Sequence, residues 1–394
     1  MKLAVLDENG SITAAFKKLA TSQSTYEVEV HTQKEPFTES LKRQPAWVMA
    51  VETDCVERTA KILGDLGMVW PRSIRIAFSN AFGVSRLRDL CGPANQFCFK
   101  PLDADAVKNR VQDAVEMIPL LTDSHIVSVV SGLQTLPTFS ESYSLLLQEL
   151  ESADPDIDKI GSAIEQDVGL FATILSLANS SFFGRSTQVT LPLEAVSTLG
   201  FGAIQSVVLA APALSLLDGN QVKGISREKF WAHSQKCAEI ARRIAKEEGL
   251  KAKAINDCYS AALLHDVGQL VLASNYGERY EAYIARSKET GEKLHELEYS
   301  QMQTDHASIG ACMLAMWGVK PEIVSAIWKH HTDPPGGADI DPTLLVYAAD
   351  WISYQLDAEN EDAVPEVASP VLQKQMQRWL RMCFDAEREA AMSA

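Results

Sequence analysis

The pattern of apolar residues changes at about residue 118, and this change constrains the fold more than any other feature of the sequence. Before it, short apolar runs alternate with segments of helical periodicity. After it, strand signals nearly vanish and helical periodicity continues to the end of the chain. Alternating strands and helices predict a parallel sheet with helices on both faces, whereas a long run of helices predicts an all-α unit. The expected fold class is therefore multidomain, α/β followed by all-α.

Three segments follow from this pattern. We expect a doubly wound α/β domain over residues 1–118, an all-helical domain over 119–355, and a linker with a C-terminal helix over 356–394. That last helix, at about 370–391, is charged and amphipathic, so it packs either on the domain or on a partner. The expected strands cover residues 2–7, 26–32, 46–51, 73–78 and 96–100. The expected helices include residues 39–43, 86–90, 142–151, 170–178, 230–247, 254–272 and 306–317.

Charge and cysteine usage narrow the classes of function. The chain has 52 acidic and 36 basic residues and a formal net charge of −16. This balance argues against nucleic acid and against an anionic membrane as partners, because both require a basic surface. The start, MKLAVLDENG, turns acidic at Asp7, where the apolar part of a signal peptide would continue. The seven cysteines are scattered and never spaced as CxxC, so we expect reduced thiols in a cytoplasmic protein.

One apolar run, LLHDVGQLVL at residues 263–272, contains a His-Asp pair. Burying an imidazole beside a carboxylate is costly unless both groups have partners. Five of the eight histidines stand on expected helices near an aspartate or another histidine. Together with two aspartates they make a set of candidate metal ligands: His233, His265, Asp266, His306, His330, His331 and Asp350.

Neutral imidazoles and carboxylates that converge from different helices are typical ligands of Zn, Fe or Mn. An aspartate can also bridge two such ions, and a paired site activates water for phosphoester hydrolysis. Each residue alone has a simpler interpretation. A single histidine on a helix can be a hydrogen-bonded core residue, and Asp350 can be a buried hydrogen-bond hub. His330 and His331 can favour a helix C-terminus by interacting with its dipole.

Several segments of the helical half resemble the HDOD domain, a bacterial signalling relative of the HD phosphohydrolases. They include LPTFSESYSLLLQEL, LANSSFFGRSTQVTLPLEAVSTLG, LLHDVGQLVL and DHASIGACMLAMWGV, and the resemblance covers about residues 125–352. HDOD domains are all-helical, are often fused to receiver modules, and are regarded as regulatory domains without demonstrated hydrolase activity. The resemblance therefore implies a regulatory domain that acts on protein partners.

The resemblance to the HD superfamily also implies a ligand set. His233, His265, Asp266 and Asp350 match the ligands of the first metal, and His306, His330 and His331 match those of a second metal in the HD-GYP branch. Three departures weigh against catalysis. Gln269 stands where the enzymes have a phosphate-binding lysine, HHTDPPGGADIDP lacks their glutamate and Gly-Tyr-Pro, and Lys229 replaces an extra acidic ligand. In the hydrolytic alternative, Asp266 and Gln269 are the candidate catalytic residues.

The first segment resembles the response-regulator receiver, a flavodoxin-like α/β domain. Asp7 and Glu8 match the acidic pair that holds Mg²⁺, and Ser79 matches the Ser/Thr switch position. Phe97 matches the aromatic switch, and Lys100 with Pro101 matches the Lys-Pro that ends the fifth strand.

The residue that receives phosphate in receivers is missing. It should be an aspartate that closes the third strand, where this chain offers Ala50 and Val51. Neither residue can serve as the carboxylate nucleophile that phosphorylation requires. We therefore expect a pseudo-receiver that serves as a docking or dimerisation platform. In the alternative, Glu52 or Asp54 lies nearby and mimics a permanent negative charge.

Two functions from different classes follow. The first is a signalling regulator without enzymatic activity, an atypical response regulator that binds protein partners, with a divalent metal as its only cofactor. The second is a metal-dependent phosphohydrolase that acts on nucleotides or cyclic dinucleotides. A sensor that binds such a nucleotide without cleaving it is a third interpretation. A homodimer is also possible in this scheme, since receiver domains commonly dimerise through their last helices; the sequence leaves the oligomeric state open.

Overall fold

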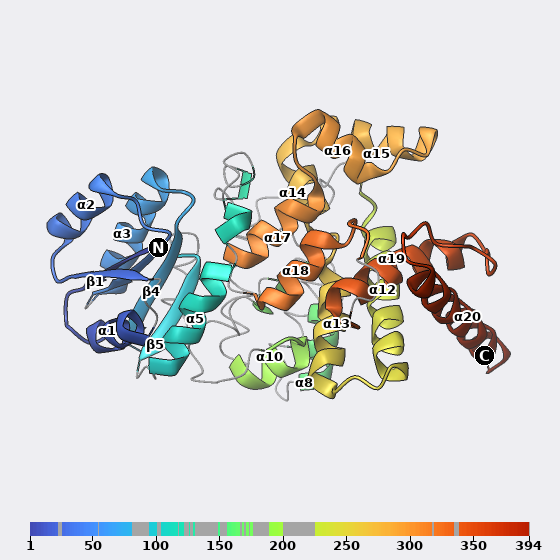
Figure 1. Cartoon of the computed structure of the whole chain (residues 1–394), viewed down its shortest axis with the longest axis horizontal. Helices are drawn as coiled ribbons and strands as arrows, with labels where there is room; N and C mark the ends of the chain where they lie inside the picture. The colour runs from blue at the N-terminus through green and yellow to red at the C-terminus, as the bar shows by residue number, and fades with distance from the viewer. Residues whose placement is uncertain are drawn as a thin grey trace. The chain divides into compact units, whose positions relative to one another are not determined.

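Figure 1 shows the computed structural model of the chain. The structure describes residues 1–22, 26–53, 55–80, 94–100, 104–116, 118–121, 126, 129–130, 149, 156–165, 168, 171–172, 174–175, 189–199, 225–316, 319–334 and 339–393. The chain divides into two compact units. Unit 1 comprises Met1–Gln221 and Cys312–Pro321, and unit 2 comprises Val222–Ala311 and Glu322–Ala394. The domain boundaries expected at residues 118 and 355 stay predictions.

Unit 1 contains a five-stranded sheet in which every pair of neighbouring strands is parallel. The strand order is β2-β1-β3-β4-β5, which is the order of flavodoxin-like folds, including receivers. The predicted α/β class is confirmed, and all five expected strands are present. Their bounds are β1 (Lys2–Asp7), β2 (Glu27–His31), β3 (Val48–Glu52), β4 (Ile74–Asn80) and β5 (Gln96–Lys100).

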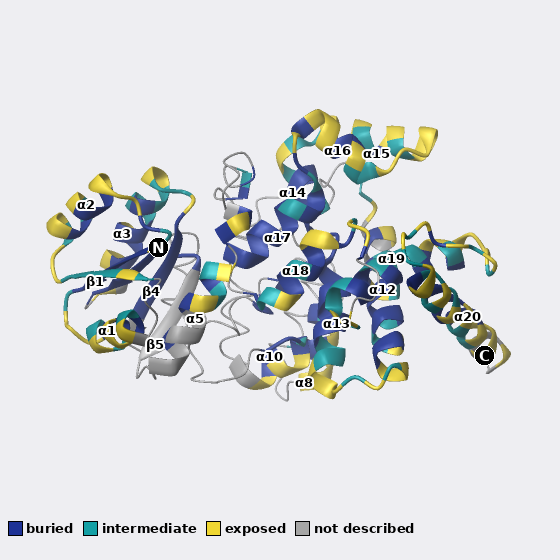
Figure 2. Cartoon of the chain, viewed as in Figure 1, coloured by how far each residue is buried: buried dark blue, intermediate teal, exposed yellow. Residues whose placement is uncertain are grey.

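Helices cover both faces of this sheet, because β1 and β3 are apolar on both faces and fully buried (Figure 2). On one face, Phe37 of α2 and Leu63 of α3 share a core with Leu6 of β1. On the other face, Phe16 of α1 packs edge-on against Phe78 of β4, with ring centroids 5.7 Å apart. The helices around the sheet are α1 (Thr13–Ser22), α2 (Lys34–Arg43), α3 (Val56–Val69) and α5 (Ala104–Glu116).

Two further helices of unit 1, α8 (Ile157–Glu165) and α10 (Pro192–Leu199), pack on each other. The expected helix at 86–90 lies outside the described residues, as do nearly all of 142–151 and most of 170–178. The same is true of most of LANSSFFGRSTQVTLPLEAVSTLG. Helix α2 begins at Lys34, five residues before the predicted start at Glu39. The prediction was too short: the helix includes Pro36, which is tolerated there because a proline is compatible with the first turn of a helix.

Unit 2 is helical throughout its described residues, as predicted. Its helices are α12 (Arg227–Glu247), α13 (Ala252–Leu264), α14 (Val267–Tyr276), α15 (Glu278–Thr290), α16 (Leu294–Met302), the start of α17 (His306–Met316), α18 (Pro321–Lys329), α19 (Pro342–Asp357) and α20 (Pro370–Ser393). Helices α12, α13 and α19 pack on one another. The continuous helix predicted over 254–272 is wrong, because the chain turns at His265 and Asp266.

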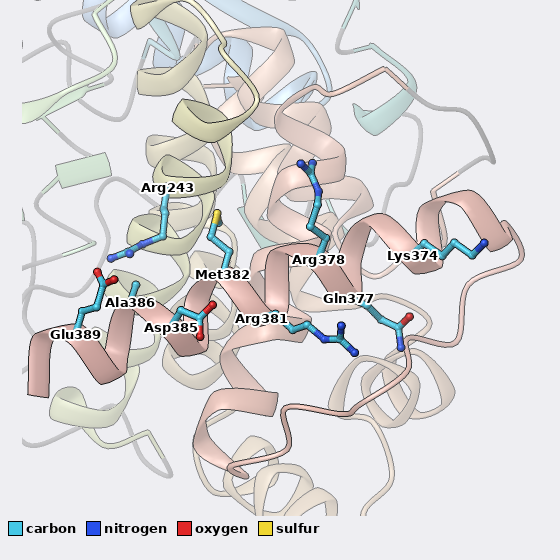
Figure 3. Close-up of a pocket in the computed structure, with 9 residues that line it drawn as sticks. All are labelled: Arg243, Lys374, Gln377, Arg378, Arg381, Met382, Asp385, Ala386 and Glu389. Atoms are coloured by element: carbon cyan, nitrogen blue, oxygen red, sulfur yellow. The ribbon is translucent and has the colours of Figure 1, made fainter.

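Helix α20 packs on the rest of unit 2 through an apolar face that includes Trp379, which is fully buried. The Trp379 Nε1–H donates to Glu248 Oε1 over 2.7 Å, and Arg378 pairs with the same carboxylate. Of the two alternatives that the sequence left open, the structure shows packing on the domain. Its charged outer face and Arg243 of α12 line a surface groove (Figure 3). None of the candidate metal ligands lines that groove. Within the described residues, no helix is long and apolar enough to cross a membrane.

Candidate metal centre

The structure brings all seven predicted ligands of unit 2 together. They come from five parts of the chain. These are His233 on α12, His265 and Asp266 at the turn after α13, His306 at the start of α17, His330 and His331 after α18, and Asp350 on α19. Most of them are buried, with 1% exposure for His265 and 2% for His306. Polar side chains collected in this way need partners, and they find them mainly in one another.

The ligands form two groups, which we call the first and the second pocket. The first pocket is formed by His233, His265 and Asp350. The Nε2 atoms of the two histidines lie 3.3 Å apart. Asp350 Oδ1 lies 3.3 Å from His233 Nε2 and 3.7 Å from His265 Nε2. The Cys237 thiol, one turn after His233, also belongs to this group. Three ligand atoms at these separations can surround one ion at ordinary metal–ligand distances of about 2.0–2.2 Å.

A second pocket is formed by His306, His330 and His331. The Nε2 atoms of His306 and His331 lie 2.9 Å apart, and the ring of His330 packs against both, with centroids 5.4 and 3.9 Å away. The ligand atoms of the three residues lie within 4.8 Å of one another. A separate group of three imidazoles therefore faces a second point in the unit.

Asp266 lies between the two pockets and presents one carboxylate oxygen to each. Its Oδ2 lies 3.6 Å from His233 Nε2 and 3.5 Å from His265 Nε2. Its Oδ1 lies 3.1 Å from His306 Nε2 and 3.8 Å from His330 Nε2. The turn between α13 and α14 produces this position, because Asp266 leaves the helical conformation at φ −93° and ψ 3°.

In His265 and His330, the Nδ1 atom contacts a backbone carbonyl, so the Nε2 atom is the ring nitrogen that faces the pockets. His265 Nδ1 lies 2.7 Å from the Ala262 carbonyl oxygen, and His330 Nδ1 lies 2.6 Å from the Ile327 carbonyl oxygen. A carbonyl can only accept, so each Nδ1–H donates to it and each Nε2 is left facing the pockets. His330 Nε2 is buried and has no hydrogen-bond partner. Such outer contacts are typical of metal-ligating histidines.

The close packing of carboxylates and imidazoles shifts the pKa values of the cluster. Burial alone would raise the pKa of Asp266, but His265 and His306 hold it well below its ordinary value. Burial, together with the charges of the neighbouring His265 and His306, lowers the pKa of His330 to about 3. Its imidazole is therefore neutral at physiological pH. The carboxylates of the cluster therefore stay ionised. Burial alone would lower the pKa of His265, but Asp266 and Asp350 raise it to about 9, so binding of an ion would release a proton from that imidazole.

The residues fit a metal centre on three grounds. The donors are imidazole and carboxylate, which suit Zn, Fe and Mn. The Nδ1 contacts leave ring nitrogens directed at the pockets, and one of those nitrogens, His330 Nε2, has no hydrogen-bond partner among the described residues. One carboxylate serves both groups. The cluster is therefore compatible with a metal site.

One buried residue at this centre was missed by the sequence analysis. Glu298 of α16 has no solvent exposure, and its Oε2 accepts from His306 Nδ1–H over 2.7 Å and from the His306 backbone N–H over 2.8 Å. Its Oε1 accepts from the Tyr280 hydroxyl over 2.5 Å. The sequence around it, HELEYSQ, has the charge pattern of a solvated helix face. No spacing rule connects it to His306.

The second pocket has another neighbour on α16 that the sequence did not indicate. The ring of His295 stacks on that of His331, with centroids 3.9 Å apart and an interplanar angle of 17°. His295 was one of three histidines left out of the candidate set. It lies on a short helix with little amphipathic character, and no aspartate or histidine stands next to it in the sequence.

The receiver-like pocket of unit 1 is built differently from a phosphorylation site. The carboxylate of Asp7 accepts from the backbone N–H groups of Ser11, Ile12 and Thr13, and Thr13 Oγ1 donates to it over 2.6 Å. Asp7 thus caps the start of α1. Glu8 pairs with Arg58 over 2.7 Å.

The strand register corrects the residue expected at the end of β3. Glu52, not Ala50 or Val51, closes this strand and pairs in register with Asp7. It is fully buried and accepts from Asn9 Nδ2 over 3.2 Å. The backbones of Ser79 and Lys100 lie near the ends of β4 and β5. Their side chains, like Asp54 as a whole, lie outside the described residues.

The fold and the site define an all-helical domain of the HD type in a chain that also carries a receiver-like sheet. The pattern of the HDOD domain matches residues 136–333, which is just over half of the chain. The chain therefore belongs to the HDOD domain family.

Known proteins resemble the chain at moderate sequence identity. An uncharacterised protein of Treponema pallidum is 25% identical over 272 residues, which are 67% of this chain and 52% of that protein. The chain thus spans about half the length of this curated relative. A solved fragment of the MmoQ response regulator of Methylococcus capsulatus is 23% identical, with a TM-score of 0.50, over 63% of this chain and 92% of that structure. At this identity, the similarity to MmoQ concerns the fold.

Proposed function

We propose that this chain is a signal-transduction regulator whose HDOD domain holds a metal centre and acts through protein–protein contact. The observation that carries the proposal is the position of Asp266, whose two oxygens face different histidine groups. Asp266 would be a ligand of two ions, one through each carboxylate oxygen. The first pocket would hold one ion through His233, His265 and Asp350, and the second pocket would hold the other through His306, His330 and His331.

Ions bound there, whether Fe, Mn or Zn, would polarise a phosphoryl oxygen and lower the pKa of bound water. At the position where the related enzymes have a phosphate-binding lysine, this chain has Gln269. Gln269 lies one turn after Asp266 on α14 and is partly buried. Its amide can hydrogen-bond to a phosphate oxygen but carries no positive charge, so it binds phosphate more weakly than lysine does. This difference favours a regulatory domain over an enzyme.

The receiver-like part of unit 1, residues 1–118, fits a role in signalling as well. It would be a docking or dimerisation platform that is not phosphorylated. Asp7 is saturated by hydrogen bonds from the start of α1, which leaves little of the acidic pair for Mg²⁺. Glu52 supplies a buried carboxylate at the end of β3. The similar solved structure of MmoQ is that of a response regulator by name, which supports a role in signalling. We place the boundaries of the two functional domains near residues 118 and 355.

A second candidate function is a metal-dependent phosphohydrolase acting on nucleotides or cyclic dinucleotides. The shared carboxylate of Asp266 favours it, because two-metal hydrolases bridge their ions in this way. In this alternative Asp266 holds the ions and Gln269 contacts the substrate. Binding of the same nucleotide without cleavage would make the domain a sensor.

Elemental analysis of the purified full-length chain tests the metal centre directly. We expect Fe, Mn or Zn in the wild type and a loss of both ions in Asp266→Ala. Asp357→Ala is the matched control, because Asp357 lies on α19, is 65% exposed and forms an ion pair with Lys236 on the surface. A wild type without metal after reconstitution would contradict the proposal.

Turnover then separates the two functions. The metal-loaded protein is incubated with bis(p-nitrophenyl) phosphate, nucleotides and cyclic dinucleotides. Bound metal without turnover supports the regulator. Turnover that Asp266→Ala abolishes and Asp357→Ala retains would establish the hydrolase instead.

A further inference from the structure

Helix α16 touches two of the three histidines of the second pocket. Glu298 is hydrogen-bonded to His306, and His295 stacks on His331. The two residues stand three positions apart on α16, so they lie on the same face of that helix. One face of a single helix thus contacts the second pocket at two independent points.

Glu298 also joins three helices. Its Oε2 accepts both donors of His306 at the start of α17, and its Oε1 accepts the hydroxyl of Tyr280 on α15. A carboxylate with no solvent exposure is costly without such donors, because nothing else replaces its hydration. Undocking α15 and α16 would therefore also release the contact that holds His306 Nε2 toward the pocket.

The first pocket is supported by other elements. His265 is held by the carbonyl of Ala262 on α13, and His233 lies near Ser353 on α19. Among the described residues, no hydrogen bond, ion pair or ring contact joins α16 to His233, His265 or Asp350. The two pockets share Asp266 but have separate outer supports.

From these contacts we infer that the α15–α16 hairpin, residues 278–302, regulates the second pocket and not the first. Docking of the hairpin and occupancy of the second pocket are coupled through Glu298 and His295. By linkage, an ion in the second pocket stabilises the docked hairpin to the extent that docking raises the affinity for that ion. Glu298 is a positioning residue that acts through His306. The inference rests on the proposed metal centre.

The test is a titration of the metal-free full-length protein with Zn²⁺ alone. It is followed by elemental analysis and by amide hydrogen exchange of peptides that cover residues 278–302. We expect two ions per chain in the wild type and slower exchange in α16 when the second ion binds. In Glu298→Gln the affinity for the second ion should fall about 10- to 100-fold, as is typical for loss of an outer carboxylate. The first ion should bind as before.

Two further variants keep the result interpretable. Glu281→Gln removes an exposed carboxylate of α15 that makes no side-chain hydrogen bond or ion pair with the described residues, and it should leave both affinities unchanged. Tyr280→Phe removes the α15 hydrogen bond to Glu298 but leaves that carboxylate in place. It should weaken only the second site, by a smaller factor, and it serves as the test if Glu298→Gln does not fold.

The outcomes are distinct. Equal binding of two ions by the wild type, Glu298→Gln and Tyr280→Phe would overturn the coupling and leave the metal centre standing. So would exchange in α16 that does not respond to Zn²⁺. A wild type that binds no ion would overturn both the metal centre and this inference.

Discussion

The backbone of Gly268 lies directly against the carbonyl oxygen of His306. A Cβ atom at Gly268 would be 1.9 Å from that oxygen and 2.8 Å from the backbone nitrogen of Gly310. Helices α14 and α17 therefore approach each other here with no side chain between them. This approach brings His306 to within 3.1 Å of Asp266, so the glycine of HDVG positions the second pocket.

Replacing Gly268 with alanine should separate the two helices. We expect Gly268→Ala to lower the free energy of unfolding by about 3 kcal/mol, at the upper end of the range for overpacked sites. Urea unfolding followed by circular dichroism measures the change. Gly249→Ala is the control, because a Cβ there meets nothing within 4 Å and only the positive φ of +72° opposes it. A loss no larger than that of Gly249→Ala would contradict the packing argument.

Trp379 should be the main anchor of α20. Trp379→Ala removes a fully buried side chain and its hydrogen bond to Glu248, so we expect a loss of about 3–5 kcal/mol in the free energy of unfolding. Arg378→Ala removes the exposed partner of the same carboxylate and should cost no more than about 1 kcal/mol. Denaturant titration of both variants makes the comparison. Similar losses would show that the helix is held by charge and not by packing.

Asp7 should make the stability of unit 1 sensitive to acid. Burial alone would raise its pKa, but hydrogen bonds from Thr13 and Ile12 hold the pKa below its ordinary value. The folded state thus favours the ionised carboxylate. That stability is fully present above the pKa of an unfolded aspartate, about 3.9, and is lost as the pH falls through the lower folded pKa.

Comparing the stability of the wild type with that of Asp7→Asn at several pH values tests whether the ionised carboxylate stabilises the fold. Near neutral pH we expect the variant to be less stable by about 1–2 kcal/mol, as for loss of a helix N-cap. The difference should shrink as the pH falls below about 4. Melting temperatures at several pH values measure it. Asp65→Asn, a change at a half-exposed site that pairs with Lys34, is the control and should leave the profile unchanged.

Acetyl phosphate should leave the intact mass of the protein unchanged. The carboxylate that closes β3 belongs to Glu52, which is buried, and the carboxylate of Asp7 is fully used at the start of α1. Mass spectrometry after incubation with acetyl phosphate and Mg²⁺ gives the answer. A stable gain of one phosphate that survives in Glu52→Gln would show that another residue is the acceptor.

The sequence predicted most of the elements because their periodicity is local. The strands of unit 1 and the long helices of unit 2 carry their pattern within a few residues. The turn at Asp266 was missed because the apolar residues of LLHDVGQLVL keep a helical spacing across the His-Asp pair. The close approach of α17 to Gly268, next to this turn, depends on residues far away in the sequence.

The seven ligands could be chosen from the sequence because imidazoles and carboxylates stand out on apolar helices. Glu298 could not, since a glutamate on a polar helix has the same local pattern whether it is solvated or buried. Only the packing of α16 against α17 gives it His306 as a partner. The pairing of Glu52 with Asp7 likewise depends on strand register, which the sequence alone left two residues in error.

The ligands of the first pocket come from opposite ends of unit 2, with His233 on its first long helix and Asp350 on its last but one. In an unfolded chain these groups are far apart, so the pocket does not exist until α19 has docked. An ion held there would close a long loop and slow the escape of either helix. The ion would then enter last in folding and leave first in unfolding, and its retention would report that the whole unit is assembled.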